Sequence, residues 1–413
     1  MKQRGNPVGL PRISNIEVAK KNLPLRITLL ALALVIAFGA FAYGISSLLT
    51  TKPGWTDIKS TSASLNCSED FVLSYNLGAG EMSATAENKQ LTALYTKATE
   101  DAYQIFNNEY ASDELHNIHY VNTHFNEEIT VEAALYKALS AIVKADNRNI
   151  YLAPAYAQYG QLFVCENDVE AMQYDPQRQD ETKAYIAELV KFANDPQMIS
   201  IEILGNQKIC LNVAQEYLEF IAANEIAYVL DFSWMVNAFI ADYIADVLLE
   251  NGFSNGYLSS YDGFTRNLLK TEDKFTLNVY HRTGREVTLP AAMTYTGSCS
   301  IVSLRDFPLS DSDRWHYYAF EDGRIASLLL DPADGAEKSA VASLISYSQT
   351  ASCADILLSI APLFIADSLD AQRLNALAED EIYTVYPGLD AVYANDSSLN
   401  ISLFGDYSRK TIE

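Results

Sequence analysis

A long apolar run lies near the start of the chain. Residues 27–49 (ITLLALALVIAFGAFAYGISSLL) form a stretch of 23 residues without a charged side chain, which is long enough for one helix to cross a bilayer. A buried helix of a soluble protein normally carries a polar stripe, and this run has none. The pattern predicts a transmembrane helix over 27–49. A cleaved signal peptide stays open as the alternative, because Ala40-Phe41-Ala42 resembles a cleavage site.

Basic side chains outnumber acidic ones before this run. Against one acid, Glu17, stand six basic residues: Lys2, Arg4, Arg12, Lys20, Lys21 and Arg26. This bias predicts a single-pass protein of the cell membrane with a cytoplasmic N-terminus and an extracytoplasmic main domain. We therefore expect four regions: a cytoplasmic basic segment 1–26, the transmembrane helix 27–49, a linker 50–66 and an extracytoplasmic domain 67–413.

Helical and strand periodicities are mixed in the rest of the chain. Apolar positions at helical spacing predict helices over 90–108, 132–146, 181–194, 239–251, 352–361 and 370–378. Short apolar or alternating runs predict strands over 71–75, 199–203, 207–212, 257–260, 275–281, 286–289, 316–320, 325–330, 340–347 and 381–386. Because strands and helices do not alternate strictly, the predicted fold class is α+β, with mixed sheets flanked by helices.

Charge and cysteine content limit the partners and sites that we expect. Without the six basic residues and Glu17, the totals of 29 Lys plus Arg and 53 Asp plus Glu leave 23 and 52 beyond residue 26. Such an excess of acid repels nucleic acid and anionic lipid headgroups, so no nucleic-acid partner is expected. Five cysteines without a CxxC pair predict neither a zinc site nor a disulfide framework, and leave open buried thiols or one or two disulfides.

One pair of oxygen side chains suggests metal chemistry. Asp355 and Ser359 lie four residues apart in the predicted helix 352–361, so they share one helix face. Oxygen ligands are those that Mg²⁺ prefers, and this ion bridges readily to phosphates. A capped or solvated helix face would carry the same two residues. From the residues alone, both interpretations stay open.

Several short motifs follow one another in an order that resembles a known family. These are Ser112-Asp113-Glu114-Leu115, the run 230–242 (LDFSWMVNAFIAD), Thr296-Gly297, the turn 331–335 (DPADG) and the segment 354–359 (ADILLS). Between about 71 and 392, this order resembles the ApbE-type FAD:protein FMN transferases, which move FMN from FAD onto a Ser or Thr of a target protein. Their versions of the second, fourth and fifth motifs read Leu-Asp-Leu-Gly-Gly-Ile-Ala-Lys-Gly-Tyr-Ala-Val-Asp, Asp-Pro-x-Thr-Gly and Ala-Asp-Ala-Leu-x-Thr.

The resemblance implies a fold, a reaction and a set of site residues. It implies an ApbE-like flavin-transferase fold and a Mg²⁺-dependent enzyme that uses FAD as substrate and a membrane or surface protein as acceptor. The implied catalytic residue is Asp355. The implied metal ligands are Asp355, Ser359 and the backbone carbonyl of Val236. The implied flavin contacts are Glu114, Asp242, Thr296 and Asp331.

Departures from the family motifs point to a second possible function. The two glycines become Ser233 and Trp234, the lysine becomes Asn237, a histidine before the Asp-Pro turn becomes Leu328, and the threonine of that turn becomes Asp334. Ser233 and Trp234 would crowd a close backbone approach to a flavin. The alternative function is therefore a catalytically degenerate ApbE-like domain that binds flavin or a protein partner without transferase activity.

Overall fold

The computed structural model describes residues 23–112, 114–269, 273–310 and 315–412, which divide into two compact units at Lys52 and Pro53. The first unit contains α1 (Leu23–Leu49). Its segment Pro24–Phe41 is long and apolar enough to cross a membrane, and none of that segment is buried. The length and composition of this segment fit the predicted span. The basic residues before Leu23, and Asp113, lie outside the described residues.

The second unit is built on one large sheet. The described residues form nine strands in the order β1 (Gly54–Ile58), β2 (Phe71–Leu77), β6 (Gly256–Ser260), β7 (Phe264–Asn267), β10 (Cys299–Arg305), β13 (Ser343–Ser348), β14 (Tyr383–Pro387), β15 (Ala391–Ala394) and β17 (Ser408–Thr411). Neighbouring strands run antiparallel except for β15 and β17. β1 falls within 50–66, so the region expected to be a linker supplies one edge of the sheet.

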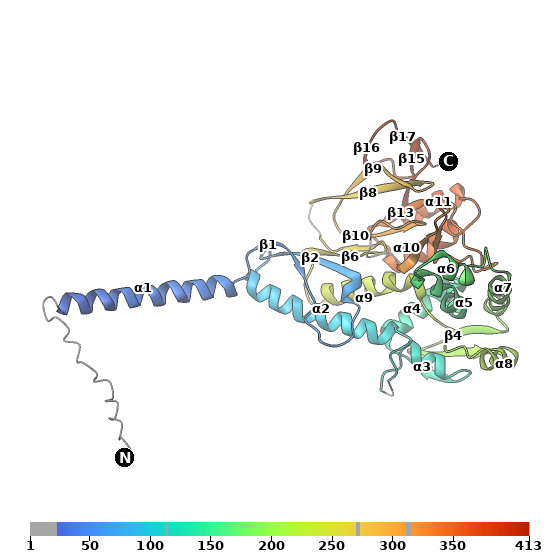
Figure 1. Cartoon of the computed structure of the whole chain (residues 1–413), viewed down its shortest axis with the longest axis horizontal. Coiled ribbons are helices and arrows are strands. Elements are labelled where there is room, and N and C mark those ends of the chain that lie inside the picture. Colours follow the sequence, from blue (N-terminus) through green and yellow to red (C-terminus); the bar gives the residue numbers. More distant parts are fainter. Residues whose placement is uncertain (1–22, 113, 270–272, 311–314, 413) are drawn as a thin grey trace, which may run out of the picture. The chain divides into compact units, whose positions relative to one another are not determined.

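The sheet separates two apolar cores because side chains alternate between its faces. On β10 and β13, Val302 and Leu344 belong to the large core on the helical side, whereas Ile301 and Ile345 belong to a smaller core. A second sheet contributes Val279 and Met293 to that smaller core. Within the described ranges it has three strands: β16 (Asn400–Leu403), β9 (Glu286–Thr296) and β8 (Lys274–Thr283). In Figure 1, β8 and β9 lie above β10 and β13, and α10 lies below them.

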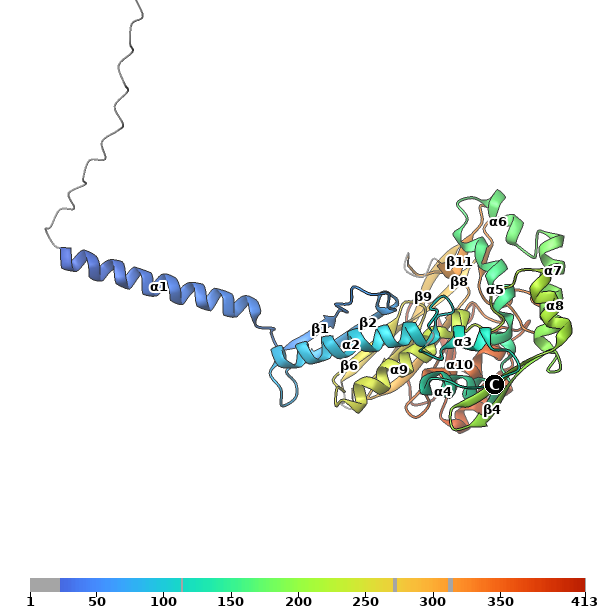
Figure 2. The ribbon, with the colours of Figure 1, turned by 90° about the horizontal axis from the view of Figure 1, so that it is seen from below.

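Three helices cover the helical face of the large sheet near the candidate site. They are α2 (Ala84–Phe106), α9 (Val236–Glu250) and α10 (Cys353–Phe364). α9 packs on β6 and β7 and against α2, and α10 packs on β10, β13 and α9. Figure 2 shows α2 and α9 extending side by side. The start of α10 therefore meets the middle of α9.

The remaining elements surround this arrangement. A third sheet, again counted over the described residues, has the strand order β3 (Glu128–Thr130), β5 (Lys208–Val213), β4 (Ile199–Gly205), and a separate hairpin joins β11 (Tyr317–Ala319) to β12 (Ile325–Ser327). The other α-helices are α3 (Ile118–Thr123), α4 (Ala133–Lys144), α5 (Ala153–Tyr159), α6 (Asp168–Tyr174), α7 (Asp180–Asn194), α8 (Gln215–Ala223) and α11 (Ala371–Ala376). The α+β class and the mixed sheets with flanking helices are confirmed.

Candidate functional site

The junction of α9 and α10 is held by one buried carboxylate. Asp242 of α9 is 6 % exposed and accepts hydrogen bonds from the backbone N–H groups of Cys353 at 3.0 Å and Ala354 at 2.8 Å. These are the first two residues of α10, whose N–H groups have no partner within the helix. Asp242 also forms an ion pair with Arg266 of β7. Burial alone would lower the pKa of Arg266, but the charge and hydrogen bond of Asp242, with the nearby Cys353 and Asp246, together raise it.

Asp355 lies at the mouth of two adjoining cavities beside this junction. The cavities have volumes of about 450 and 300 Å³ and share Lys137, Asp246, Ser352 and Asp355; together we call them the Asp355 cleft. The larger cavity is mainly apolar, and its lining includes Phe106, Ala134, Ala138, Phe239, Tyr243 and Val247. The smaller cavity has a mixed lining that is more polar than that of the larger one, and its polar residues include Arg266, Asn267, Ser298, Ser300, Gln349 and Thr350. The cleft thus offers an apolar end and a polar end on either side of one carboxylate.

Lys137 and Asp246 form an ion pair in the lining of the cleft. The Lys137 Nζ lies 2.8 Å from Asp246 Oδ2, and the two side chains are 73 % and 39 % exposed. The hydrogen bond with Asp246 raises the pKa of Lys137. Neither Lys137 nor Arg266 was predicted from the sequence as a site residue. The position of Asp246, four residues after Asp242 in one helix, was the available signal for Asp246.

Asp355 and Ser359 both make hydrogen bonds within their own helix. The carboxylate of Asp355 accepts from the Ser352 hydroxyl at 2.8 Å and from the Ser352 N–H at 3.3 Å, which with the bond from Asp355 N–H to Ser352 Oγ forms a capping box. The Ser359 hydroxyl donates to the Asp355 carbonyl at 2.8 Å. Asp355 is exposed, and both bonds to its carboxylate use Oδ2, which leaves Oδ1 for a ligand. Ser359 does not line the cleft.

The protein oxygen atoms in the cleft could bind Mg²⁺ only if a substrate supplied further oxygen ligands to the ion. Among the described residues, no group of three His, Cys, Asp or Glu side chains is placed to hold a metal ion. Mg²⁺ commonly binds to proteins through one or two carboxylates, keeps several waters and takes further oxygens from phosphates. Asp355 and Asp246 both line the cleft, but Asp246 is paired with Lys137, so Asp355 is the carboxylate that is open to a metal ion bound mainly by a substrate.

The other implied site residues lie away from Asp355. Val236 opens α9 and lines a different cavity. Glu114 is exposed, and Thr296 ends β9 with its carbonyl 3.5 Å from Nε2 of Gln349 in the cleft wall. Asp331 forms an ion pair with Lys338 at 2.8 Å. Of the implied residues, the structure therefore brings only Asp242 and Asp355 together in the lining of one cavity, and Asp242 is already occupied by its structural contacts.

Bulky side chains occupy the segment that precedes α9. Trp234 is 6 % exposed and donates from Nε1 to the Tyr156 hydroxyl at 3.1 Å. Ser233 has a φ of 48°, in the left-handed region that favours glycine, and its hydroxyl donates to Asp231 at 2.7 Å. The Trp234 side chain is therefore packed inside the protein, and Ser233 lines a cavity beside the start of α9.

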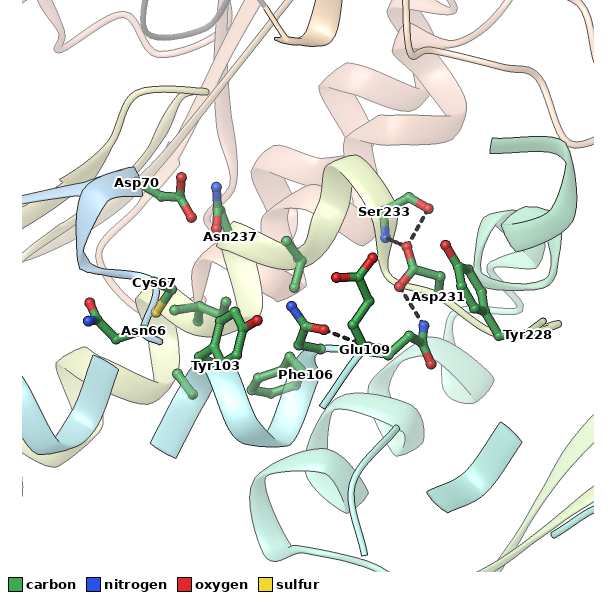
Figure 3. Close-up of a pocket in the computed structure, with 15 residues that line it drawn as sticks. Asn66, Cys67, Asp70, Tyr103, Phe106, Glu109, Tyr228, Asp231, Ser233 and Asn237 are labelled. Carbon is green, nitrogen blue, oxygen red and sulfur yellow. Dashed lines mark hydrogen bonds between the residues drawn. The ribbon is translucent and has the colours of Figure 1, made fainter. Parts of the chain in front are cut away.

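Another cavity, of about 370 Å³, is separate from the two of the Asp355 cleft and lies beside the first turns of α9 (Figure 3). Its lining comes from the start of α9, the end of α2, the segment around Asp70 and the segment that contains Tyr228 and Asp231. An adjoining cavity, of about 310 Å³, shares Asp70 and Asn237 with it. We call these two joined cavities the acidic pocket. None of the described residues that line it is a lysine or arginine.

Comparison with known proteins gives structural matches alone. The flavin transferase ApbE from Vibrio cholerae superposes with a TM-score of 0.54 at 11 % identity, over 85 % of this chain and 97 % of that chain. The ApbE protein from Thermotoga maritima gives a TM-score of 0.53 at 10 % identity, over 84 % and 96 %. A histidine-to-glycine mutant of the Vibrio protein gives 0.52 at 13 % identity, over 86 % and 97 %. No protein-family model matches the chain, and neither does any curated protein sequence. At these identities the likeness establishes the fold.

Proposed function

Because this chain has the fold of the ApbE flavin transferases, we propose that it is a membrane-anchored FAD:protein FMN transferase. The proposed reaction breaks the pyrophosphate of FAD, releases AMP and attaches FMN to a Ser or Thr hydroxyl of a membrane or surface protein. The observation that carries the proposal is the match over 84–86 % of the chain to three structures of ApbE proteins.

The two ends of the Asp355 cleft suit the two parts of FAD. The apolar end, with Phe239 and Tyr243, would take a ring system. The polar end contains Lys137 and Arg266, whose positive charges would attract the phosphates. Both cations are already paired, Lys137 with Asp246 and Arg266 with Asp242, so phosphates would compete with these carboxylates for them.

Asp355 would carry the chemistry at the boundary of the two ends. Its carboxylate would accept the proton of the acceptor hydroxyl, and with oxygens of the substrate it would hold Mg²⁺. When bound, Mg²⁺ would neutralise charge that develops on the phosphate oxygens. Ser352 keeps the Asp355 carboxylate oriented through the capping box.

Helix α1 would anchor the enzyme in a bilayer. The segment Pro24–Phe41 has a mean hydropathy of 2.1 and no buried side chains, and the basic residues before it favour a cytoplasmic N-terminus. The domain beyond Pro53 would then act on the extracytoplasmic side, where the acceptor protein would be reached at the membrane.

The direct test incubates the full chain in detergent micelles with FAD and Mg²⁺ and measures AMP release by chromatography. Covalent flavin on a peptide that contains Ser and Thr is measured by fluorescence after denaturation. We expect both products, and we expect EDTA to abolish them. FAD binding without AMP release would refute the transferase reaction. Absence of FAD binding would refute every flavin-based function.

The variant Asp355→Asn tests the catalytic assignment. Asparagine retains an oxygen that can accept the hydrogen bonds from Ser352, but it removes the charge and the base. We expect AMP release to fall by at least about 100-fold, the lower end of the contribution of a positioned acid or base. The matched control is Asp370→Asn at the N-cap of α11, where the side chain caps Arg373 N–H. Activity in Asp355→Asn equal to that in Asp370→Asn would refute the assignment.

One observation favours the second function, flavin or partner binding without transfer. Trp234 takes the place of a motif glycine in the segment before α9, and its Nε1 donates a hydrogen bond to the Tyr156 hydroxyl. Trp234 does not line the Asp355 cleft, so the second function would apply to a flavin that binds at the start of α9 instead; the wild type would then bind FAD without releasing AMP. The variant Trp234→Gly would then gain AMP release, which a transferase that already works would not show.

A further inference from the structure

The acidic pocket contains hydrogen-bond acceptors that lack donors. Asn237 is 8 % exposed, and its Oδ1 is buried without a partner, while its Nδ2 donates to Asp262 Oδ2 at 2.9 Å. The other carboxylate oxygen of Asp262, Oδ1, is also buried without a partner. Burial of an acceptor without a donor is unfavourable by about 1–3 kcal/mol. This end of the pocket is therefore incomplete without groups that donate hydrogen bonds.

Three carboxylates, those of Glu69, Asp70 and Asp262, line the same end, together with His316. Figure 3 shows the side chains of Asp70 and Asn237 facing each other at one end of the pocket. Partial burial, and then the charges of Asp262 and Glu69, raise the pKa of Asp70 to about 6. Position 237 is where the family motif has lysine, so this chain lacks the cation that such a motif would place here.

The opposite end of the pocket is acidic as well. Glu109 extends into the cavity and Asp231 lies beyond it, next to Tyr228 (Figure 3). Asp231 is already bonded to Ser233 and Asn108, which leaves Glu109 as the available carboxylate. Between the two ends lie Tyr103 and Phe106, whose rings attract cations and methylene groups.

We propose that the acidic pocket binds a linear aliphatic diamine or polyamine. One ammonium group donates its three hydrogens to Asn237 Oδ1, Asp262 Oδ1 and the Asp70 carboxylate, which match its three donors. The methylene chain packs along Tyr103 and Phe106, and the second ammonium pairs with Glu109. Both of these acceptor atoms are buried, so binding of the first ammonium requires the side chains that cover them to move.

An ammonium group satisfies this site better than a metal ion does. Among the described residues, no three metal-ligating side chains converge, so a divalent ion would have at most two carboxylates and one amide oxygen. The aromatic middle of the pocket adds nothing to a metal ion, but it stabilises an alkylammonium chain by cation–π contact and apolar burial.

The test is isothermal titration calorimetry of the full chain in detergent micelles at about 150 mM salt, which screens non-specific attraction to this acidic protein. The probes are putrescine, cadaverine and spermidine, with n-pentylamine, Nα-acetyl-lysine methylamide and Mg²⁺ for comparison. We expect 1:1 binding of the diamines and spermidine, at least about tenfold tighter than either monoamine. Equal affinity for cadaverine and n-pentylamine would overturn the two-ended site, and the absence of diamine binding at millimolar concentrations would overturn the proposal.

The variant Asn237→Lys supplies an internal ammonium group to the same acceptors. We expect it to weaken diamine binding at least tenfold and to keep the fold, as judged by thermal unfolding. The matched control Asn251→Lys adds the same charge at an exposed position at the end of α9 and should bind as the wild type does. Equal binding by both variants would mean non-specific attraction and would overturn the site. A third variant, Glu109→Gln, should bring the diamines to the affinity of the monoamines.

The readout does not depend on the proposed flavin chemistry. The acidic pocket and the Asp355 cleft are lined by different residues of α9, although Phe106 of α2 lines both, and binding is measured without FAD. Loss of AMP release with retained diamine binding would refute the transferase alone. The reverse result would refute the amine site alone.

Discussion

At the residue scale, Asp242 connects three elements through one carboxylate. It accepts from two N–H groups of α10 and pairs with Arg266 of β7. Removal of one partner from a buried ion pair leaves an uncompensated charge and typically destabilises by about 3–5 kcal/mol. We therefore expect Asp242→Asn to lower the free energy of unfolding by about 3 kcal/mol, measured by urea denaturation. In the control Asp101→Asn, which breaks the exposed pair with Lys97, the loss should stay below about 1 kcal/mol; comparable losses would contradict the role of Asp242.

The raised pKa of Asp70 makes the stability of the protein depend on pH. Its pKa is raised from 3.8 to about 6 in the folded protein, so the folded state binds a proton more tightly than the unfolded state. The resulting stabilisation is complete below pH 3.8 and is lost as pH rises through about 6. Asp70→Asn removes the charge, and at pH 8 it should be more stable than the wild type by about 1 kcal/mol after solvent screening. Urea denaturation at pH 4 and pH 8 checks this: a difference that does not shrink at pH 4 would rule out the charge as its cause.

At the element scale, the turn 331–335 docks on α7. Gly335 has a φ of 72°, and a Cβ built there would lie 2.7 Å from Ile186 Cγ2 and 2.9 Å from Val190 Cγ2. Gly335→Ala thus adds a steric clash to the strain of a left-handed conformation, and we expect a destabilisation of about 2–3 kcal/mol. The control Gly405→Ala has a φ of 59° and open space around it, so it should lose only about 1 kcal/mol. Calorimetric unfolding of both variants measures the difference, and equal losses would contradict the contact with α7.

Long periodic elements were predictable from sequence, and short or edge elements were not. The predicted helix 181–194 appears as Asp180–Asn194, and the hairpin 199–212 appears as β4 and β5. Helix α2 starts at Ala84 rather than at 90, because the Ser83 side chain accepts from Ala86 N–H and caps it there. β7 has four residues and no distinctive pattern, so its interior position between β6 and β10 depends on pairing that sequence does not display.

The candidate site was predictable only in part for the same reason. The approach of Asp242 to the first residues of α10 joins positions more than 100 residues apart, and no local pattern encodes it. Asp355 and Ser359 were selected by spacing, but their hydrogen bonds to Ser352 and to the helix backbone are equally local. Lys137 occupies an ordinary polar position of the amphipathic helix α4. Only the packing of that helix places it in the lining of the cleft, so no pattern in the sequence indicated it.

At the scale of the whole molecule, the chain divides at Lys52 and Pro53. The sheet and both apolar cores lie beyond Pro53. We therefore expect the fragment 53–413 to unfold in one cooperative transition, with the same midpoint as the full chain in detergent, because the fragment retains every core contact. Circular dichroism during heating provides the measurement. A fragment that melts earlier or gradually would show that the domain depends on the preceding segment.

Because Cys353 is buried, the rate at which its thiol is labelled reports how often α10 detaches from the domain. This thiol is 0 % exposed, donates to the Thr265 carbonyl, and has a pKa raised well above its usual value by burial. A disulfide reagent can reach it only after α10 leaves the helices and strands that cover it, so its labelling rate follows that excursion rather than thiol reactivity. Cys165 and Cys210 are partly exposed and will react first. Cys67 and Cys299 are buried as well, so the modification of Cys353 itself, located by peptide mass spectrometry, will time the fluctuations of α10.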